Sequence, residues 1–482
     1  MSEREGSQRE PEMSERAGSQ REPTPLVVLD VVGLTPQLLE HLPRLRAACA
    51  NGFTARLDPV LPAVTCTVQA TVLTGATPRE HGIVGNGWYF RDLGEVLLWR
   101  QHHRLVGGEK VWQAARRVRP DYTVANICWW YAMGADVDWT VTPRPIYRAD
   151  GRKDPDCYTY PADLHDELEA ALGVFPLFSY WGPGAGIASS AWICRAAQHV
   201  LATRNPDLTL VYVPHLDYDL QRFGPADPRA AAAAAELDAV LGPLLDAAAA
   251  RGATVVALSE YAITAAHRPV HVNRTLRAAG LLHVHTQDGM EYLDPWTSRA
   301  FAVADHQVAH LYVRDPDDLA AVAKLGAEQP GVAEVLDAEG KARHGLDHAR
   351  SGDLVLVAEP DAWFTYYYWT DAGAAPDFAT HVEIHRKPGY DPAELFFDPA
   401  GPGAAKRRAA VALARKKLGM RYRMNVVGLD AGAAAVRGSH GRLPESAAEA
   451  PVLLCSDPGP ARDRLAATEV KALLLRLAGL SP

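Results

Sequence analysis

The sequence predicts an α/β fold in which a mostly parallel sheet is flanked by helices and carries a smaller inserted α+β cap. Short β-rich runs alternate with longer helical patterns, which is typical of a parallel sheet with helical connections. The 482-residue chain is also too long for one simple core. Its composition, 48% hydrophobic and 22% charged residues, is typical of a soluble globular protein.

Three of the predicted strands end in a carboxylate, namely Asp30, Asp217 and Glu260. In open α/β sheets, ligands bind at the carboxyl ends of the strands. One such acid is more often a turn or cap residue, but three from distant parts of the chain favour a shared cation cluster. The strands are predicted at residues 25–30, 123–130, 208–217 and 253–260, and an Ala-rich helix at 228–252.

The chain divides into four predicted regions. Its first residues are polar, contain a near-duplicate segment and lack the apolar core of a signal peptide, so we expect a disordered tail. The regions are a tail at 1–24, a core at 25–260 and 420–445, a cap at 261–419, and a C-terminal loop and helix at 446–482.

Charge, hydropathy and cysteine usage argue against a nucleic-acid-binding, membrane-spanning or disulfide-bonded protein. A net charge of -9 argues against a nucleic-acid polymer as partner, and no apolar run approaches the length of a membrane span. The six cysteines are scattered without a CxxC pair, so we expect reduced, mostly buried thiols in a cytoplasmic protein. The oligomeric state stays open.

The most informative segment lies near the N-terminus. An apolar strand ending in Asp30 precedes LPAVTCTVQATVLTGATPREHGIVGN, which combines a Thr-rich turn, a helical stretch and, at its end, Asn86. A carboxylate to hold a divalent cation, a hydroxyl to be activated and an amide to bind phosphoryl oxygens are what metal-assisted phosphoryl transfer needs.

This segment resembles the type I phosphodiesterase/nucleotide pyrophosphatase branch of the alkaline phosphatase superfamily. That family carries a proline, a nucleophilic Thr, LTG, P-x-x-HGI and an Asn at the same spacing, and the likeness extends over residues 25–445. The resemblance implies an alkaline-phosphatase-like core, with Thr65 as the nucleophile and Asn86 at the phosphoryl oxygens.

The family's other motifs are partly altered here. Its D-x-x-G-H-x-x-G-P becomes DYDLQRFGP and its S-D-H-G becomes SEYA, whereas its G-x-H-G is intact as GSHG. The resemblance thus implies metal ligands at Asp30, Thr65, Asp217, Gln221, Glu260 and His440. Oxygen donors in place of imidazole suit Mg²⁺ or Mn²⁺ better than Zn²⁺. We therefore expect one or two divalent ions, Zn, Mn or Mg.

Other residues are weaker candidates. Ligands or supporting groups could come from His215, Tyr261, His271, Asp305 and His306, although a lone histidine is more often structural. A substrate wall or clamp could involve Trp129, Trp130, Tyr367 and Arg386, although the aromatic run is more often cap core and the arginine could equally lie in a solvated loop.

The predicted function is hydrolysis of a small phosphodiester or pyrophosphate through a phospho-threonine intermediate. Two alternatives remain open: a phosphomonoesterase or phosphonate hydrolase using the same site, and a degenerate member that binds a phosphoryl ligand without turnover. The altered positions Gln221, Glu260 and Tyr261 motivate the second alternative.

Overall fold

The computed structural model describes residues 24–149, 153–397, 402–420 and 426–480. The predicted tail, residues 1–24, lies outside the described residues except for Thr24.

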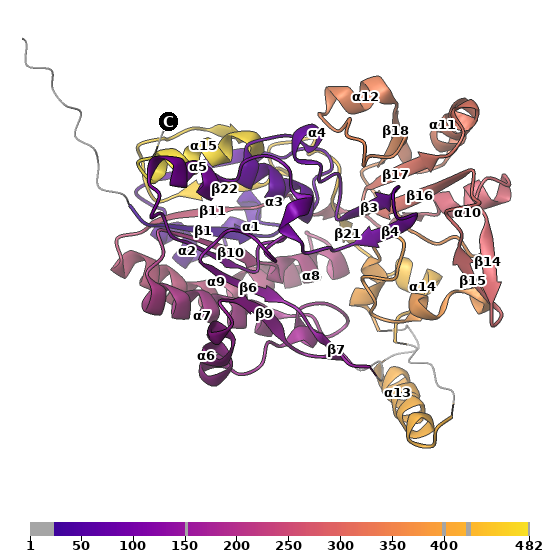
Figure 1. Cartoon of the computed structure of the whole chain (residues 1–482), viewed down its shortest axis with the longest axis horizontal. Helices are drawn as coiled ribbons and strands as arrows, with labels where there is room; N and C mark the ends of the chain where they lie inside the picture. The colour runs from indigo at the N-terminus through magenta and orange to yellow at the C-terminus, as the bar shows by residue number, and fades with distance from the viewer. Residues whose placement is uncertain (1–23, 150–152, 398–401, 421–425, 481–482) are drawn as a thin grey trace, which may run out of the picture.

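A nine-stranded mixed sheet forms the larger part of the molecule (Figure 1). Its five middle strands run parallel, and the strands on either side of them, β22 and β9, run antiparallel to their neighbours. In spatial order the strands are β23 (Arg464–Ala466), β2 (Phe53–Asp58), β22 (Val452–Cys455), β11 (Thr254–Leu258), β1 (Leu26–Val31), β10 (Leu208–Val213), β5 (Val124–Ile127), β6 (Trp139–Pro143) and β9 (Cys157–Tyr160).

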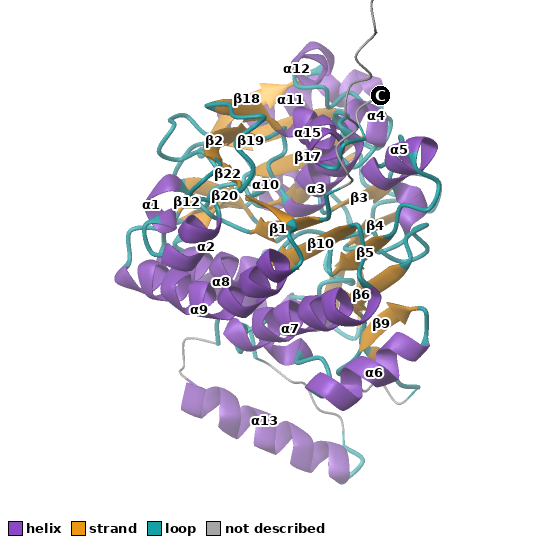
Figure 2. Ribbon diagram, turned by 90° about the vertical axis from the view of Figure 1, so that its left-hand side faces the viewer, coloured by secondary structure: helices purple, strands orange, loops and turns teal. Residues whose placement is uncertain are grey.

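Helices cover both faces of this sheet, as the alternation along β1 requires. Val27, Leu29 and Val31 enter one apolar core, whereas Leu26 and Val28 enter another on the opposite face. The first face is covered by α2 (Pro43–Ala48), α7 (Ile187–Arg204) and α9 (Pro228–Ala250), and the second by α3 (Thr65–Thr74), α5 (Val111–Val118) and α15 (Val470–Leu477). Figure 2 shows the two layers.

A second core lies beside the main sheet. It contains a four-stranded antiparallel sheet and the aromatic run of residues 363–369. Its strands are β16 (Ala300–Asp305), β17 (Val308–Val313), β19 (Leu354–Ala358) and β18 (Val332–Leu336), and its helices are α10 (Val272–Ala278), α11 (Leu319–Glu328) and α12 (Ala338–Arg343).

Shorter elements complete the described chain. The remaining helices are α1 (Pro36–Leu39), α4 (Pro78–His81), α6 (Asp163–Leu172), α8 (His215–Phe223), α13 (Pro402–Lys417) and α14 (Asp430–Ala433). The small two-stranded pairs are β3 (Gly87–Phe90) with β4 (Glu95–Leu98), β7 (Ile146–Tyr147) with β8 (Lys153–Asp154), β12 (Thr264–Ala265) with β21 (Gly438–Ser439), β13 (Arg268–Val270) with β20 (Ala362–Phe364), and β14 (Val284–Gln287) with β15 (Met290–Leu293). No helix in the described part of the chain has the length and apolar character needed to cross a bilayer.

The structure corrects two details of the sequence interpretation. The strand predicted at 208–217 ends at Val213, because Pro214 turns the chain and α8 begins at His215. Asp217 is therefore a helical residue. Residues 446–482, expected to form a loop and a helix, also supply β22 and β23 to the main sheet. All six cysteines are buried and free, as predicted.

Asp238 of α9 caps α2, which has no side-chain cap of its own. Its carboxylate accepts hydrogen bonds from Arg44 N and Leu45 N, both at 3.0 Å, and is buried. We expect Asp238→Ala to lower the free energy of unfolding by about 1–3 kcal/mol, because it leaves two N–H groups of the first turn, including the buried one of Leu45, without an acceptor. The exposed Asp246, which pairs with the Arg44 side chain, provides the control. Asp246→Ala should change the free energy of unfolding by less than about 1 kcal/mol, with both variants measured by urea titration.

Candidate active site

Thr65 is the first residue of helix α3 and lies next to Glu260, at the carboxyl end of β11. Val64 before it is extended, so the hydroxyl of Thr65 is held where the chain changes from strand-like to helical conformation. The next amide, Cys66 N, donates to Asn86 Oδ1 at 2.9 Å. The side chain of Asn86 is thereby fixed against the first turn of the helix. Both predicted catalytic residues lie together, and both are almost fully buried.

Two buried carboxyl groups face each other next to Thr65. Asp30 lies near the end of β1. Glu260 lies two residues beyond the end of β11, which is the strand next to β1. Gln69 Nε2 donates to Asp30 Oδ2 at 2.9 Å, but within the described part of the chain the other Asp30 oxygen and both Glu260 oxygens have no hydrogen-bond donor. Burial raises the pKa of Asp30 to about 7, and burial together with the nearby Asp30 charge raises the pKa of Glu260 well above its ordinary value.

A third acid, Asp217, lies on the first turn of α8. Gln221, one helical turn later, donates from Nε2 to Asp217 Oδ2 at 2.9 Å, and its Oε1 accepts from the Tyr390 hydroxyl at 2.9 Å. Asp217 Oδ1 has no partner, and burial raises the pKa of Asp217 to about 7. Gln221 therefore orients the acid but has its own oxygen already engaged.

Tyr261 lies between these groups. Its hydroxyl is hydrogen bonded to Thr65 Oγ1 at 3.1 Å and also faces the Asp217 carboxylate. Burial raises the pKa of Tyr261 well above its ordinary value, with the charges of Asp217 and Glu260 adding to the effect. The phenol is therefore neutral and acts as a hydrogen-bonding group beside the nucleophile position rather than as an anionic ligand.

Four rings stack across the site. Tyr261 lies on His440 with ring centroids 3.5 Å apart and planes 5° from parallel. His440 is 3.8 Å from His306, and His306 is 3.5 Å from Tyr390. His440 Nδ1 lies 2.9 Å from the Ala63 carbonyl, so that nitrogen carries the proton, and its buried Nε2 is left with a free lone pair.

Asp305 connects the second core to Asn86. It accepts hydrogen bonds from Asn86 N at 2.7 Å, from Asn86 Nδ2 at 3.1 Å and from His306 Nδ1 at 2.7 Å. His306 follows directly, with a φ of 59° in the turn between β16 and β17. Both residues, predicted as ligands or supporting groups, are thus part of the site, and Asp305 holds the amide of Asn86.

The donor set fits divalent cations. Five acceptor atoms around Thr65 lack a hydrogen-bond partner among the described residues: the free oxygen of Asp30, the two oxygens of Glu260, the free oxygen of Asp217 and Nε2 of His440. Buried charges of this kind need a proton or a cation. In the described residues no three histidine, cysteine or carboxylate atoms of this site lie within 4.8 Å of one another. A cation bound here would therefore need the Thr65 hydroxyl or solvent as a further ligand.

Several predicted residues make their contacts elsewhere in the described structure. His215 faces Glu236 at 3.2 Å, and His271 Nδ1 lies 2.7 Å from the Thr365 hydroxyl. Trp129 packs in the core between the main sheet and α3, α5 and α15, and Tyr367 packs in the core beside the main sheet. Arg386 pairs with Asp377 at the surface. Trp130, in contrast, donates its backbone N–H to Gln69 Oε1 at 2.8 Å and so supports the group that binds Asp30.

Two residues of the site were not predicted from the sequence. Gln69 lies four residues after Thr65, a spacing that places both on one face of α3 and could have revealed it. Tyr390 follows Arg386 by four residues, and nothing in the local sequence pattern distinguishes it as a site residue.

A cavity of about 120 Å³ lies against Tyr261 and Ala63, with Gln307 and Arg442 also in its wall.

Most of the chain is similar to one known family. A family model described as type I phosphodiesterase/nucleotide pyrophosphatase matches residues 26–391. No curated protein sequence matches the chain. Among solved structures, murine ectonucleotide pyrophosphatase/phosphodiesterase 5, solved in an inactive form with AMP, is 14% identical, with a TM-score of 0.57 over 95% of this chain and 96% of that one.

Phosphonoacetate hydrolase from Sinorhizobium meliloti, solved with phosphonoformate, is 16% identical, with a TM-score of 0.59 over 95% of this chain and 96% of that one. At these identities the likeness establishes the fold, and the family match adds the motifs. The chain therefore belongs to the type I phosphodiesterase/nucleotide pyrophosphatase family of the alkaline phosphatase superfamily.

Proposed function

We propose that this protein hydrolyses a small phosphate diester or anhydride, with Thr65 as the nucleophile and a phospho-threonine intermediate. The observation that carries the proposal is the position of the Thr65 hydroxyl. It stands at the first turn of α3, between the Asp30–Glu260 pair and Asp217, with Asn86 fixed beside it. The AMP and phosphonate ligands of the two structural neighbours support a small phosphoryl substrate.

Asn86 is placed to bind a phosphoryl oxygen. Its Oδ1 is used by Cys66 N, and one Nδ2 hydrogen is used by Asp305. The second Nδ2 hydrogen is available for substrate. Tyr261 offers a further neutral hydroxyl within 3.1 Å of Thr65 Oγ1. Together these donors would stabilise negative charge that develops on the phosphoryl group.

Divalent cations complete the proposal. Asp30, Glu260 and Thr65 would hold one ion, and Asp217 with His440 would hold a second, weaker one. Such an ion lowers the pKa of a bound hydroxyl and neutralises phosphoryl charge. The oxygen-rich first set favours Mn²⁺ or Mg²⁺, whereas the imidazole of His440 keeps Zn²⁺ open for the second.

A ligand-binding protein without turnover is the second candidate. It is favoured by Gln221 and Tyr261, which stand where the family motifs have histidine and are both engaged in hydrogen bonds. A phosphomonoesterase or phosphonate hydrolase differs from the main proposal only in substrate. Hydrolysis of bis-p-nitrophenyl phosphate, p-nitrophenyl phosphate or phosphonoacetate, each assayed with every metal, would identify a diesterase, a monoesterase or a phosphonate hydrolase, and hydrolysis of none of them would favour the binding protein.

Thr65→Ala should abolish diesterase turnover, with kcat falling at least about 10³-fold because the covalent route is lost. Metal content should be measured in parallel, since one ligand oxygen is removed as well. Thr67→Ala is the matched control, because Thr67 is a buried threonine of the same helix whose hydroxyl has no partner. Undiminished activity in Thr65→Ala would rule out the phospho-threonine intermediate.

Asn86→Ala should cost about 3 kcal/mol of transition-state stabilisation, which is the loss expected for one donor to a developing oxyanion. The effect should fall mainly on kcat in steady-state assays with the diester. Asn126→Ala is the control, because it removes another buried amide, bonded to Trp129 N at 3.0 Å, from a neighbouring strand end. An equal loss in both variants would assign the effect to folding.

Glu260→Gln should stabilise the metal-free protein, increasingly so between about pH 5 and about pH 8. A raised carboxyl pKa means that the folded state binds extra protons. The stability from those protons is complete below the ordinary carboxyl pKa and is lost as pH rises through about 7, the pKa of Asp30. Removing one of the two acids relieves that loss. Urea unfolding after chelation measures the difference, and added Mn²⁺ should reverse it in favour of the wild type; a pH-independent difference would contradict the coupling of this pair.

A further inference from the structure

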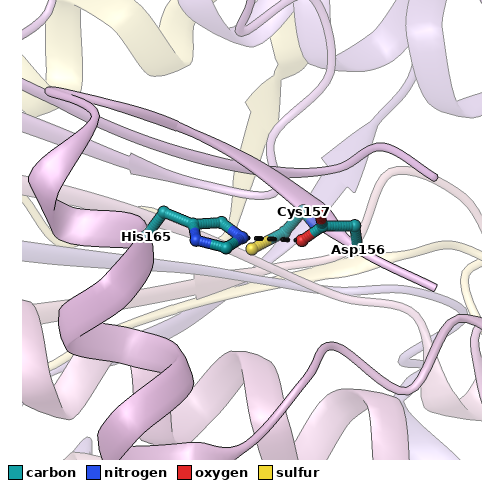
Figure 3. Close-up of side chains that lie close together, drawn as sticks. All are labelled: Asp156, Cys157 and His165. Carbon is teal, nitrogen blue, oxygen red and sulfur yellow. Dashed lines mark hydrogen bonds and ion pairs between the residues drawn. The ribbon is translucent and has the colours of Figure 1, made fainter. Parts of the chain in front are cut away.

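A cluster of metal-binding side chains lies outside the candidate active site, at the start of β9 and in α6. Asp156, Cys157 and His165 each offer one ligand atom, and these three atoms all lie within 4.8 Å of one another. Figure 3 shows the imidazole of His165 pointing from its helix toward the Cys157 sulfur and the Asp156 carboxylate. In the described residues this is the one group of three such donors that meets that distance.

The positions of these side chains are fixed from several directions. His165 Nε2 lies 2.7 Å from Asp156 Oδ1, and its Nδ1 lies 3.1 Å from Asp166 Oδ1. Asp156 Oδ1 also accepts the Cys157 backbone N–H at 2.7 Å. A carboxylate on the far nitrogen of a histidine is the arrangement that orients metal-binding imidazoles in proteins.

A fourth donor is available on the same helix. Glu169 follows His165 by four residues, so the two side chains lie on one face of α6. Its carboxylate adds a negative charge near both Cys157 and His165. The buried Cys157 thiol and the partly exposed His165 thus lie in a region of negative potential that favours a cation.

We propose that Asp156, Cys157 and His165 bind a Zn²⁺-type cation, with Glu169 or water in the fourth position. Thiolate, imidazole and carboxylate are the ligands that Zn²⁺ takes in a tetrahedral site, and the soft sulfur excludes Mg²⁺ and Ca²⁺. On binding, the Cys157 thiol and His165 Nε2, which faces Asp156 Oδ1 in the metal-free protein, both release their protons to solvent, and the proton on His165 Nδ1 is donated to Asp166.

The site would join an edge strand to the helix that follows it. β9 stands at the end of the main sheet and pairs with β6, and α6 begins three residues after it. A cation held by ligands from both elements would tie this end of the sheet together. The inference is independent of the proposed function, because none of its ligands belongs to the candidate active site.

Cobalt titration of the full-length protein tests the site directly. Co²⁺ bound to a thiolate gives a sulfur-to-metal charge-transfer band, and the candidate active site has only oxygen and nitrogen donors to offer. We expect this band to saturate at a single site per chain and to be displaced by Zn²⁺. Cys157→Ser should abolish it, and Asp166→Asn should weaken Co²⁺ binding by roughly 10–100-fold.

Two controls keep the test specific. Cys194→Ser and Cys66→Ser remove other buried thiols, one on α7 and one beside Asn86, and should leave the band unchanged. His165→Asn, at a partly exposed position, should also abolish the band and keeps the test decisive if Cys157→Ser does not fold. Absence of the band in the wild type, or its persistence in both ligand variants, would overturn the proposal.

Discussion

Asp30, Glu260 and Asp217 carry carboxyl groups into the interior at the end of the parallel strands, where no lysine or arginine in the described structure forms an ion pair with them. Such groups are stable only when a proton or a cation neutralises them. The surrounding groups follow from this requirement: Gln69 and Gln221 each donate to one acid, and Tyr261 lies between Thr65 and Asp217. The site is thus built around three acidic side chains that no lysine or arginine of the described structure neutralises.

The altered family positions change the character of the site rather than empty it. A tyrosine where the motif has histidine exchanges a metal ligand for a neutral hydroxyl. The same ring stacks on His440 and continues through His306 to Tyr390, so it also supports the remaining imidazole. Glutamine at position 221 retains the orientation of Asp217 but gives its oxygen to Tyr390.

The parts of the fold that follow local pattern could be predicted from the sequence. Alternating runs gave the parallel sheet, and the PAVT…HGIVGN segment brought Thr65 and Asn86 together as expected. The apolar run of β10 is followed by Pro214, which ends the strand at Val213 and places Asp217 on a helix, so the strand predicted to reach Asp217 is too long. Contacts between distant segments left no local signal. The register of β22 and β23 and the approach of Tyr390 to Gln221 depend on packing across the chain.

The bond from Asp305 to Asn86 has a consequence for substitutions in the four-stranded sheet. Asp305 is the last residue of β16 in the four-stranded sheet, yet its carboxylate is hydrogen bonded to Asn86 beside Thr65. A movement that lifted this region as a rigid lid would break the two hydrogen bonds that hold Asn86. A substitution that displaces Asp305 would therefore also displace Asn86, which lies far from it in the sequence but is held by its carboxylate.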